Sequence, residues 1–178
     1  MILVKLKSLN LYYTYVIYEI DAPPLPRRSM DFNEVPDAYH FTKKGELFLQ
    51  YDSGPATQRL VIFGTPTSLN WLRQADILGF DGTFKTSPTI FAQIFSVHVF
   101  MKSRCVAAVV ALMTGQDEHG YAQCFRQLKQ LCPEMNPSLF ICDFERASLN
   151  ACELEFSNSN RHGCIFHFQQ AIVRKVNF

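Results

Sequence analysis

The apolar positions of the chain follow two different periods, and the period changes near residue 115. Before that point, three runs rich in β-branched and aromatic residues occupy residues 76–84, 90–101 and 105–114, with only "KTSPT" and "KSR" between them. Gaps of this length cannot hold a crossover helix. The runs therefore predict three antiparallel strands that lie side by side.

Beyond residue 115 the pattern alternates between helices and strands. In "GYAQCFRQLKQLC" the apolar residues fall on one face of a helix, beginning with Tyr121 and Cys124. The later runs predict a strand in "SLFICDF", a helix in "ERASLNACELEF", a last strand in "RHGCIFHF" and a helix in "QQAIVRKVNF". The whole order predicts an α/β fold, a mixed five-stranded sheet with helices on its faces. Right-handed crossovers would place the strand that carries Asp143 beside the first of the three antiparallel strands.

The N-terminal half contains a proline-rich break followed by signals for two strands and a helix. Three prolines in "DAPPLPRRS" interrupt any regular element, so we expect residues 1–31 to form a flexible extension. Residues 32–74 would then form a segment ahead of the main sheet, with strands in "GELFLQYDSG" and "RLVIFG" and a helix in "TPTSLNWLRQA". In that helix Thr65 is the expected N-cap and Pro66 the first helical residue. Residues 75–178 would form the core.

Composition excludes some classes of protein. Hydrophobic residues make up 48% of the 178 residues, which is ample for a packed core, and no apolar run reaches the length of a membrane span. The six cysteines mostly lie in apolar runs, which indicates reduced thiols in the core. From Ala75 onward nine Lys and Arg balance nine Asp and Glu, so this region alone lacks the charge of a strong nucleic-acid binder.

Asp81 stands within the apolar run "ILGFDGTFKTSP" and permits two interpretations. Asp-Gly between apolar residues is a strong signal for a tight hairpin turn. Alternatively the run is one strand that displays the acid, and Gly82 allows the backbone to approach whatever Asp81 binds. A buried acid of that kind needs a partner or a metal ion.

Asp143 in "CDFERASLNA" also has two interpretations. It could cap the helix that follows and complement its dipole. If its strand adjoins that of Asp81, however, two carboxylates meet and repel unless a divalent cation lies between them. Such a pair is half of a two-metal site for phosphoryl transfer.

Cys164 and His167 form a C-x-x-H pair in "GCIFHF". A structural zinc site would need two more ligands, for which His162 and Cys152 are the nearest candidates. The alternative is a buried thiol beside a hydrogen-bonded core histidine. No cysteine stands in the exposed, electropositive setting of a nucleophile.

Together, "GELFLQYDSG", "RLVIFGT", "FDGTFKTSPTIFAQIFSVHVF", "LFICDFERA" and "GCIFHFQQAIVRK" resemble the transposase domain of Mutator-like elements. The resemblance covers residues 32–178. It implies a ribonuclease-H-like fold, Asp-Asp-Glu chemistry with Mg²⁺ or Mn²⁺, transposon-end DNA as substrate, a transposase oligomer and a nuclear location. By resemblance Asp81 and Asp143 are the first two catalytic, metal-binding acids, with Gly82 and Thr83 beside the site. Cys164 and His167 match a signature to which we assign no role.

The sequence departs from the family pattern in its third acid. The family's glutamate follows the C-x-x-H signature at a distance, whereas Phe178 is eleven residues after His167 and the nearest glutamates all precede it, at 145, 153 and 155. Two acids alone would hold Mg²⁺ weakly. We therefore expect a core that is incomplete at its C-terminus and an inactive fragment. The alternative is a domesticated module that binds DNA or protein without cleaving.

Overall fold

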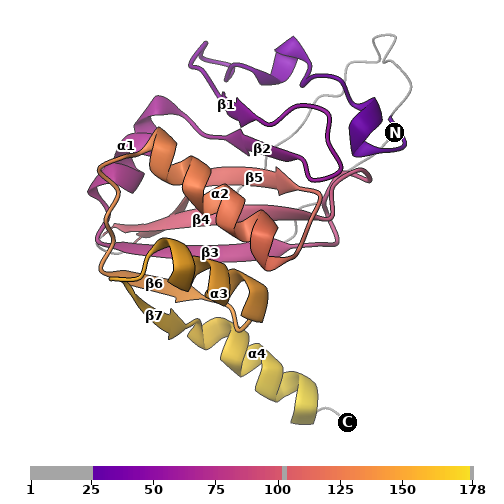
Figure 1. The fold of residues 1–178 in the computed structure, drawn as a ribbon. Helices are drawn as coiled ribbons and strands as arrows, with labels where there is room; N and C mark the ends of the chain where they lie inside the picture. The colour runs from indigo at the N-terminus through magenta and orange to yellow at the C-terminus, as the bar shows by residue number, and fades with distance from the viewer. Residues whose placement is uncertain (1–25, 102–103, 177–178) are drawn as a thin grey trace.

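A mixed sheet of seven strands runs through the molecule in the order β1-β2-β5-β4-β3-β6-β7 (Figure 1). The computed structural model describes residues 26–101 and 104–176, so most of the extension expected at residues 1–31 lies outside the described part. The strands are β1 (Leu49–Asp52), β2 (Leu60–Phe63), β3 (Ile77–Thr83), β4 (Gln93–Met101), β5 (Arg104–Met113), β6 (Leu139–Cys142) and β7 (Asn160–Gly163). The helices are α1 (Pro66–Gln74), α2 (Glu118–Leu131), α3 (Arg146–Glu155) and α4 (Ile165–Val176), with short 3-10 turns at Ser29–Asp31 and Asp37–Tyr39.

The expectation of five strands is wrong, because β1 and β2 extend the same sheet. β2 pairs antiparallel with β5, from Leu60 opposite Met113 to Phe63 opposite Val110. Val61 and Ile62 point to opposite faces of β2, and both are fully buried. A strand that is apolar on both faces is stable inside a sheet and not as a separate segment ahead of it.

The central part of the sheet follows the predicted order. β3, β4 and β5 are antiparallel neighbours. β6 lies parallel to β3 on the other side, and β7 lies parallel to β6. The prediction that the strand ahead of Asp143 adjoins the first antiparallel strand is therefore confirmed.

Helices α2 and α3 lie side by side over one face of the sheet (Figure 1). Beneath them five phenylalanines form a cluster with ring centroids 4.9–6.4 Å apart, namely Phe80, Phe95, Phe125, Phe140 and Phe156. Burial of each such ring contributes about 1.5–3 kcal/mol. Helix α1 also contributes to this core, and Thr65 caps it as predicted, in a capping box with Ser68. The aromatic cluster fixes the position of β3 and β6.

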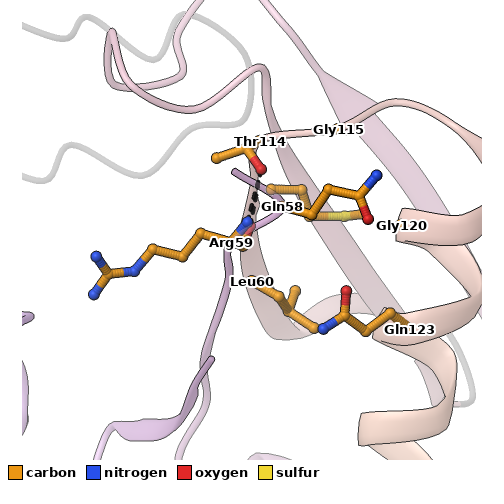
Figure 2. A pocket seen from close by; sticks show the side chains of 8 residues that line it. Gln58, Arg59, Leu60, Thr114, Gly115, Gly120 and Gln123 are labelled. Carbon is orange, nitrogen blue, oxygen red and sulfur yellow. Dashed lines mark hydrogen bonds between the residues drawn. The ribbon is translucent and has the colours of Figure 1, made fainter. Parts of the chain in front are cut away.

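Arg59 anchors the N-terminal segment to the sheet. The residue is 1% exposed, and its guanidinium donates to both Asp52 carboxylate oxygens, at 2.9 and 2.6 Å. It also donates to the Phe32 carbonyl and stacks on the Phe32 ring. Figure 2 shows a small hollow beside the Arg59 backbone, whose N–H donates to Thr114 Oγ1, while the guanidinium points away. None of the acidic residues described below lines this hollow.

The cysteines are all free, and four of them are buried as predicted, at positions 124, 132, 142 and 152. Cys105 is exposed and Cys164 is half-buried, so the expectation of core thiols is wrong for these two. None of the helices that the structure describes combines the length and the apolar character needed to cross a membrane.

The last strand is shorter than predicted, because β7 ends at Gly163 and α4 begins at Ile165. β6 has four residues and pairs with all four of β7, so a longer strand would find no partner on that side. The apolar residues Ile165, Phe168 and Ile172 recur at helical spacing, and they outweigh the strand-like run "CIFHF". Helix α4 extends away from the sheet and buries no residue (Figure 1).

Candidate metal centre

Asp81 lies inside strand β3, and the hairpin interpretation is wrong. Asp81 pairs with Ser96 of β4, and the ladder continues through Gly82 and Thr83 without a turn. Its neighbour Phe80 points into the aromatic core. Because successive side chains of a strand alternate, Asp81 projects to the opposite face. The acid is thus displayed on the face of the sheet away from α2 and α3.

Asp143 follows β6 directly and lies next to Asp81. Cys142 pairs with Phe80 in the parallel ladder, so the next residue of each strand is an aspartate. The alternative interpretation, in which Asp143 caps α3, is wrong, because the N-cap is Glu145. Instead Asp143 Oδ1 accepts the backbone N–H of Phe144 at 2.6 Å. The two acidic side chains are about equally open to solvent, 39% exposed for Asp81 and 43% for Asp143.

His167 completes the cluster from the first turn of α4. Its Nε2 lies 3.5 Å from Asp81 Oδ1, and its Nδ1 lies 4.0 Å from Asp143 Oδ1. One ligand atom from each of the three side chains lies within 4.8 Å of the others. Sequence reasoning placed His167 at the end of a strand. Its imidazole points toward the acids because α4 begins early, at Ile165. The helical spacing of the apolar residues in this segment is the sequence signal that could have predicted the early start.

Cys164 does not join the cluster. Its backbone N–H donates to the Cys142 carbonyl at 2.8 Å, which extends the β6–β7 ladder by one residue before α4 begins. Among residues 26–101 and 104–176, Asp81, Asp143 and His167 form the only group of three or more metal-capable side chains whose ligand atoms lie close enough together to share an ion. The proposed zinc ligands at 152, 162 and 164 therefore do not assemble in the described part of the chain.

The electrostatic environment opposes a bare negative charge at Asp81. Burial is the main factor that raises the pKa of Asp81 above its usual 3.8, and the Asp143 charge adds to it. The nearby His167 and His98 act in the other direction. His98 lies on β4, with Nε2 2.8 Å from Ser96 Oγ, and burial lowers its pKa below 6.5. A bound cation would relieve the repulsion between the two carboxylates.

The cluster fits a divalent ion by its chemistry and its spacing. Ligand atoms 2.0–2.6 Å from one ion lie at most about 5 Å apart, and the three side chains meet this limit. Carboxylates suit Mg²⁺ and Mn²⁺, while an imidazole suits transition metals better than Mg²⁺. The donor set of two carboxylates and one imidazole therefore suits Mn²⁺ better than Mg²⁺.

Glu145 lies near the acids and outside the cluster. Its Oε2 is 2.7 Å from the Tyr121 hydroxyl, which is also 3.0 Å from Gln93 Oε1. The hydroxyl has one hydrogen, so both contacts are hydrogen bonds only when the Glu145 carboxyl carries a hydrogen of its own. Burial raises the pKa of Glu145; the Tyr121 hydrogen bond opposes this, and the Asp143 charge adds to it. Sequence reasoning did not find this contact, because its three residues are far apart in the chain.

Gly82 and Thr83 occupy the last two positions of β3, directly after Asp81. A Cβ on Gly82 would stand 2.8 Å from Gln93 Oε1, closer than side chains tolerate. The glycine thus admits the buried Gln93 side chain next to the Asp81 backbone.

Comparison with known families agrees with this arrangement. Residues 77–171 match the family described as the MULE transposase domain, a span that includes Asp81, Asp143, Cys164 and His167. No curated protein and no solved structure matched the chain. The family span covers 95 of the 178 residues, more than half. The chain therefore belongs to the family of MULE transposase domains.

Proposed function

We propose that this chain carries the metal-binding part of a DNA transposase catalytic site, with Asp81 and Asp143 as the catalytic carboxylates. The observation that carries the proposal is that the two aspartates end up side by side on neighbouring parallel strands, facing His167. An acidic pair around a divalent ion is the arrangement that phosphoryl-transfer sites use.

The proposal includes a ribonuclease-H-like core within the larger sheet. Its support is the strand order β5-β4-β3-β6-β7, in which three antiparallel strands are followed by two parallel ones. Two helices on one face, α2 and α3, make the crossovers. In this interpretation β1 and β2 are additions at the edge next to β5.

Each side chain would have a separate task. Asp81 and Asp143 would hold Mn²⁺ or Mg²⁺, which when bound would stabilise negative charge at a phosphodiester and activate water. His167 would provide a nitrogen ligand through Nε2, the ring atom nearer to Asp81. The hydrogen bond from Phe144 N–H would keep Asp143 Oδ1 oriented toward the shared space.

We further propose that the 178 residues by themselves bind metal without cutting DNA efficiently. Their described part gathers two acids in the cluster, and Glu145, the nearest further acid in sequence, is bound to Tyr121. The family implies transposon-end DNA as partner, a transposase oligomer and a nuclear location, and we include these in the proposal.

A second candidate is a domesticated transposase module that binds DNA or protein without catalysis. The observation that favours it is the apolar surface of α4, whose exposed residues are Ile165, Phe166, Phe168, Ile172, Val173 and Val176. Apolar surface of this extent marks interaction sites on soluble domains. This candidate uses the same fold and needs no cleavage.

Nicking of a supercoiled plasmid tests the choice between cleaving and binding. The full chain is incubated with Mn²⁺, and Asp81→Asn is the matched control because it keeps the side-chain shape and removes the charge. We expect nicking no faster than that of Asp81→Asn. Mn²⁺-dependent nicking that Asp81→Asn abolishes would show that the chain cleaves and would exclude the binding module.

A further inference from the structure

A polar chain of three side chains, two of them buried and one half-buried, lies behind the acidic cluster, on the face of the sheet that α2 and α3 cover. It consists of Tyr121 on α2, Gln93 on β4 and Glu145 at the start of α3, joined by the contacts of 2.7 and 3.0 Å described above. Tyr121 and Gln93 are both fully buried. Gln93 Nε2 also donates to the Gly115 carbonyl at 3.0 Å. Because an unpaired polar group at this depth costs about 1–3 kcal/mol, the three side chains fix one another's positions.

The two ends of this polar chain adjoin the two aspartates. Gln93 Oε1 packs against Gly82, where a Cβ would approach it to 2.8 Å, and Gly82 is the residue after Asp81. Glu145 is the N-cap of α3 and the second residue after Asp143. A shift at either end would therefore move the backbone of one aspartate relative to the other.

The hydroxyl of Tyr121 is not needed to fill space. Its ring packs against Phe95, with centroids 5.2 Å apart, and a phenylalanine ring would occupy the same volume. The hydroxyl instead restricts the geometry of its neighbours. Hydrogen bonds between a buried hydroxyl, a carboxyl and an amide require one arrangement of the three groups, whereas apolar contacts tolerate several.

We propose that Tyr121 is a positioning residue that, through Gln93 and Glu145, holds the segments carrying Asp81 and Asp143 at the spacing that a shared cation needs. This inference rests on the proposed function, since the spacing of the two aspartates matters only if they share a cation. The brace itself, defined as Tyr121, Gln93 and Glu145, can be tested without any metal.

The experiment compares Tyr121→Phe with Leu128→Ala in the full chain. Leu128 is buried two turns further along α2, so its truncation lowers stability without removing either polar contact. Hydrogen–deuterium exchange is measured for peptides that include residues 80–83 and 143–146. We expect both segments to exchange at least about fivefold faster, relative to peptides of β5, in Tyr121→Phe than in Leu128→Ala, because a lost hydrogen bond loosens its neighbours locally whereas a core cavity destabilises the whole sheet. The same exchange relative to β5 in the two variants would overturn the brace.

A second pair of variants covers the case in which Tyr121→Phe does not fold. Glu145→Gln keeps a side chain that can still pair with the hydroxyl, and Glu145→Ala does not. We expect wild-type exchange at residues 80–83 in Glu145→Gln and faster exchange in Glu145→Ala. Unchanged exchange in Glu145→Ala would contradict the transmission from Glu145 to Gly82.

The metal response distinguishes this inference from the proposed function. In a Mn²⁺ titration followed by thermal melting, Tyr121→Phe is expected to raise the midpoint concentration about fivefold or more, and Leu128→Ala to leave it unchanged. An unchanged midpoint in Tyr121→Phe would overturn the positioning role. Failure of the proposed function would appear elsewhere, as a wild-type response that Asp81→Asn does not alter.

Discussion

Replacing Asp81 by asparagine should stabilise the metal-free protein. The change keeps the size of the side chain and removes a charge that the fold disfavours, since burial raises the pKa of Asp81 above 3.8. A group whose pKa is higher in the folded state contributes its stability below pH 3.8 and loses it as the pH rises through the folded value. At neutral pH the ionised Asp81 therefore lowers the free energy of unfolding, and an amide does not.

The size of the effect follows from the distance between the carboxylates. Their nearest ligand atoms lie within 4.8 Å, at which two charges repel by about 0.9 kcal/mol in water and about 3.5 kcal/mol at an effective dielectric constant of 20. Asp81 is 39% exposed, and attraction to His167 offsets part of the repulsion, so the lower figure applies. We expect about 1 kcal/mol, which raises the melting temperature of a chain of this size by about 2–4 °C.

Thermal unfolding in EDTA at neutral pH, followed by the fluorescence of Trp71, measures this difference. Asp76→Asn is the matched control, because Asp76 is an exposed acid just ahead of the same strand. We expect no change in the control. A lower melting temperature for Asp81→Asn than for wild type would contradict this expectation, since it would mean that the ionised carboxylate is already well compensated without a metal ion.

Three further predictions concern the surroundings of the site and the fold. Gly82→Ala should lower the free energy of unfolding by about 2–3 kcal/mol in urea, because a Cβ 2.8 Å from Gln93 Oε1 displaces a buried, hydrogen-bonded amide; a change below 0.5 kcal/mol would contradict this. Arg59→Met should cost about 3–5 kcal/mol in the same assay by leaving Asp52 unpaired, and a neutral result would show that the ion pair is dispensable. Burial lowers the pKa of His98 below 6.5, so the melting temperature should fall as the pH drops below 6.5. His98→Gln should make this fall smaller. Identical pH profiles of melting temperature for wild type and His98→Gln would exclude His98 as the cause of the fall.

Short-range patterns were sufficient to predict the central strands and their neighbours. The short gaps between the apolar runs required antiparallel pairing, and right-handed crossovers required the strand ahead of Asp143 to adjoin β3. The pairing of β2 with β5 was not predicted. Val61 and Ile62 lie on opposite faces of β2 and are both apolar, which indicates a buried strand, but no local pattern specifies which strand a buried strand pairs with.

The candidate site was predicted in part. Asp81 and Asp143 follow from the strand order, whereas His167 depended on where β7 ends, and "CIFHF" satisfies the pattern of a strand as well as that of a helix. The contact between Tyr121 and Glu145 joins residues 24 positions apart through side-chain geometry alone. Periodicity cannot reveal such a contact, because it specifies which face is buried and not which polar atoms meet.

The melting temperature of wild type and of Asp143→Asn with and without Mn²⁺ tests the shared cation most directly. A site with a dissociation constant near 1 mM would stabilise the wild type by about 1.4 kcal/mol at ~10 mM Mn²⁺, or about 3–6 °C. We expect this rise in the wild type and its loss in Asp143→Asn. The same rise in both proteins, or none in the wild type, would contradict the claim that Asp81, Asp143 and His167 form one metal site.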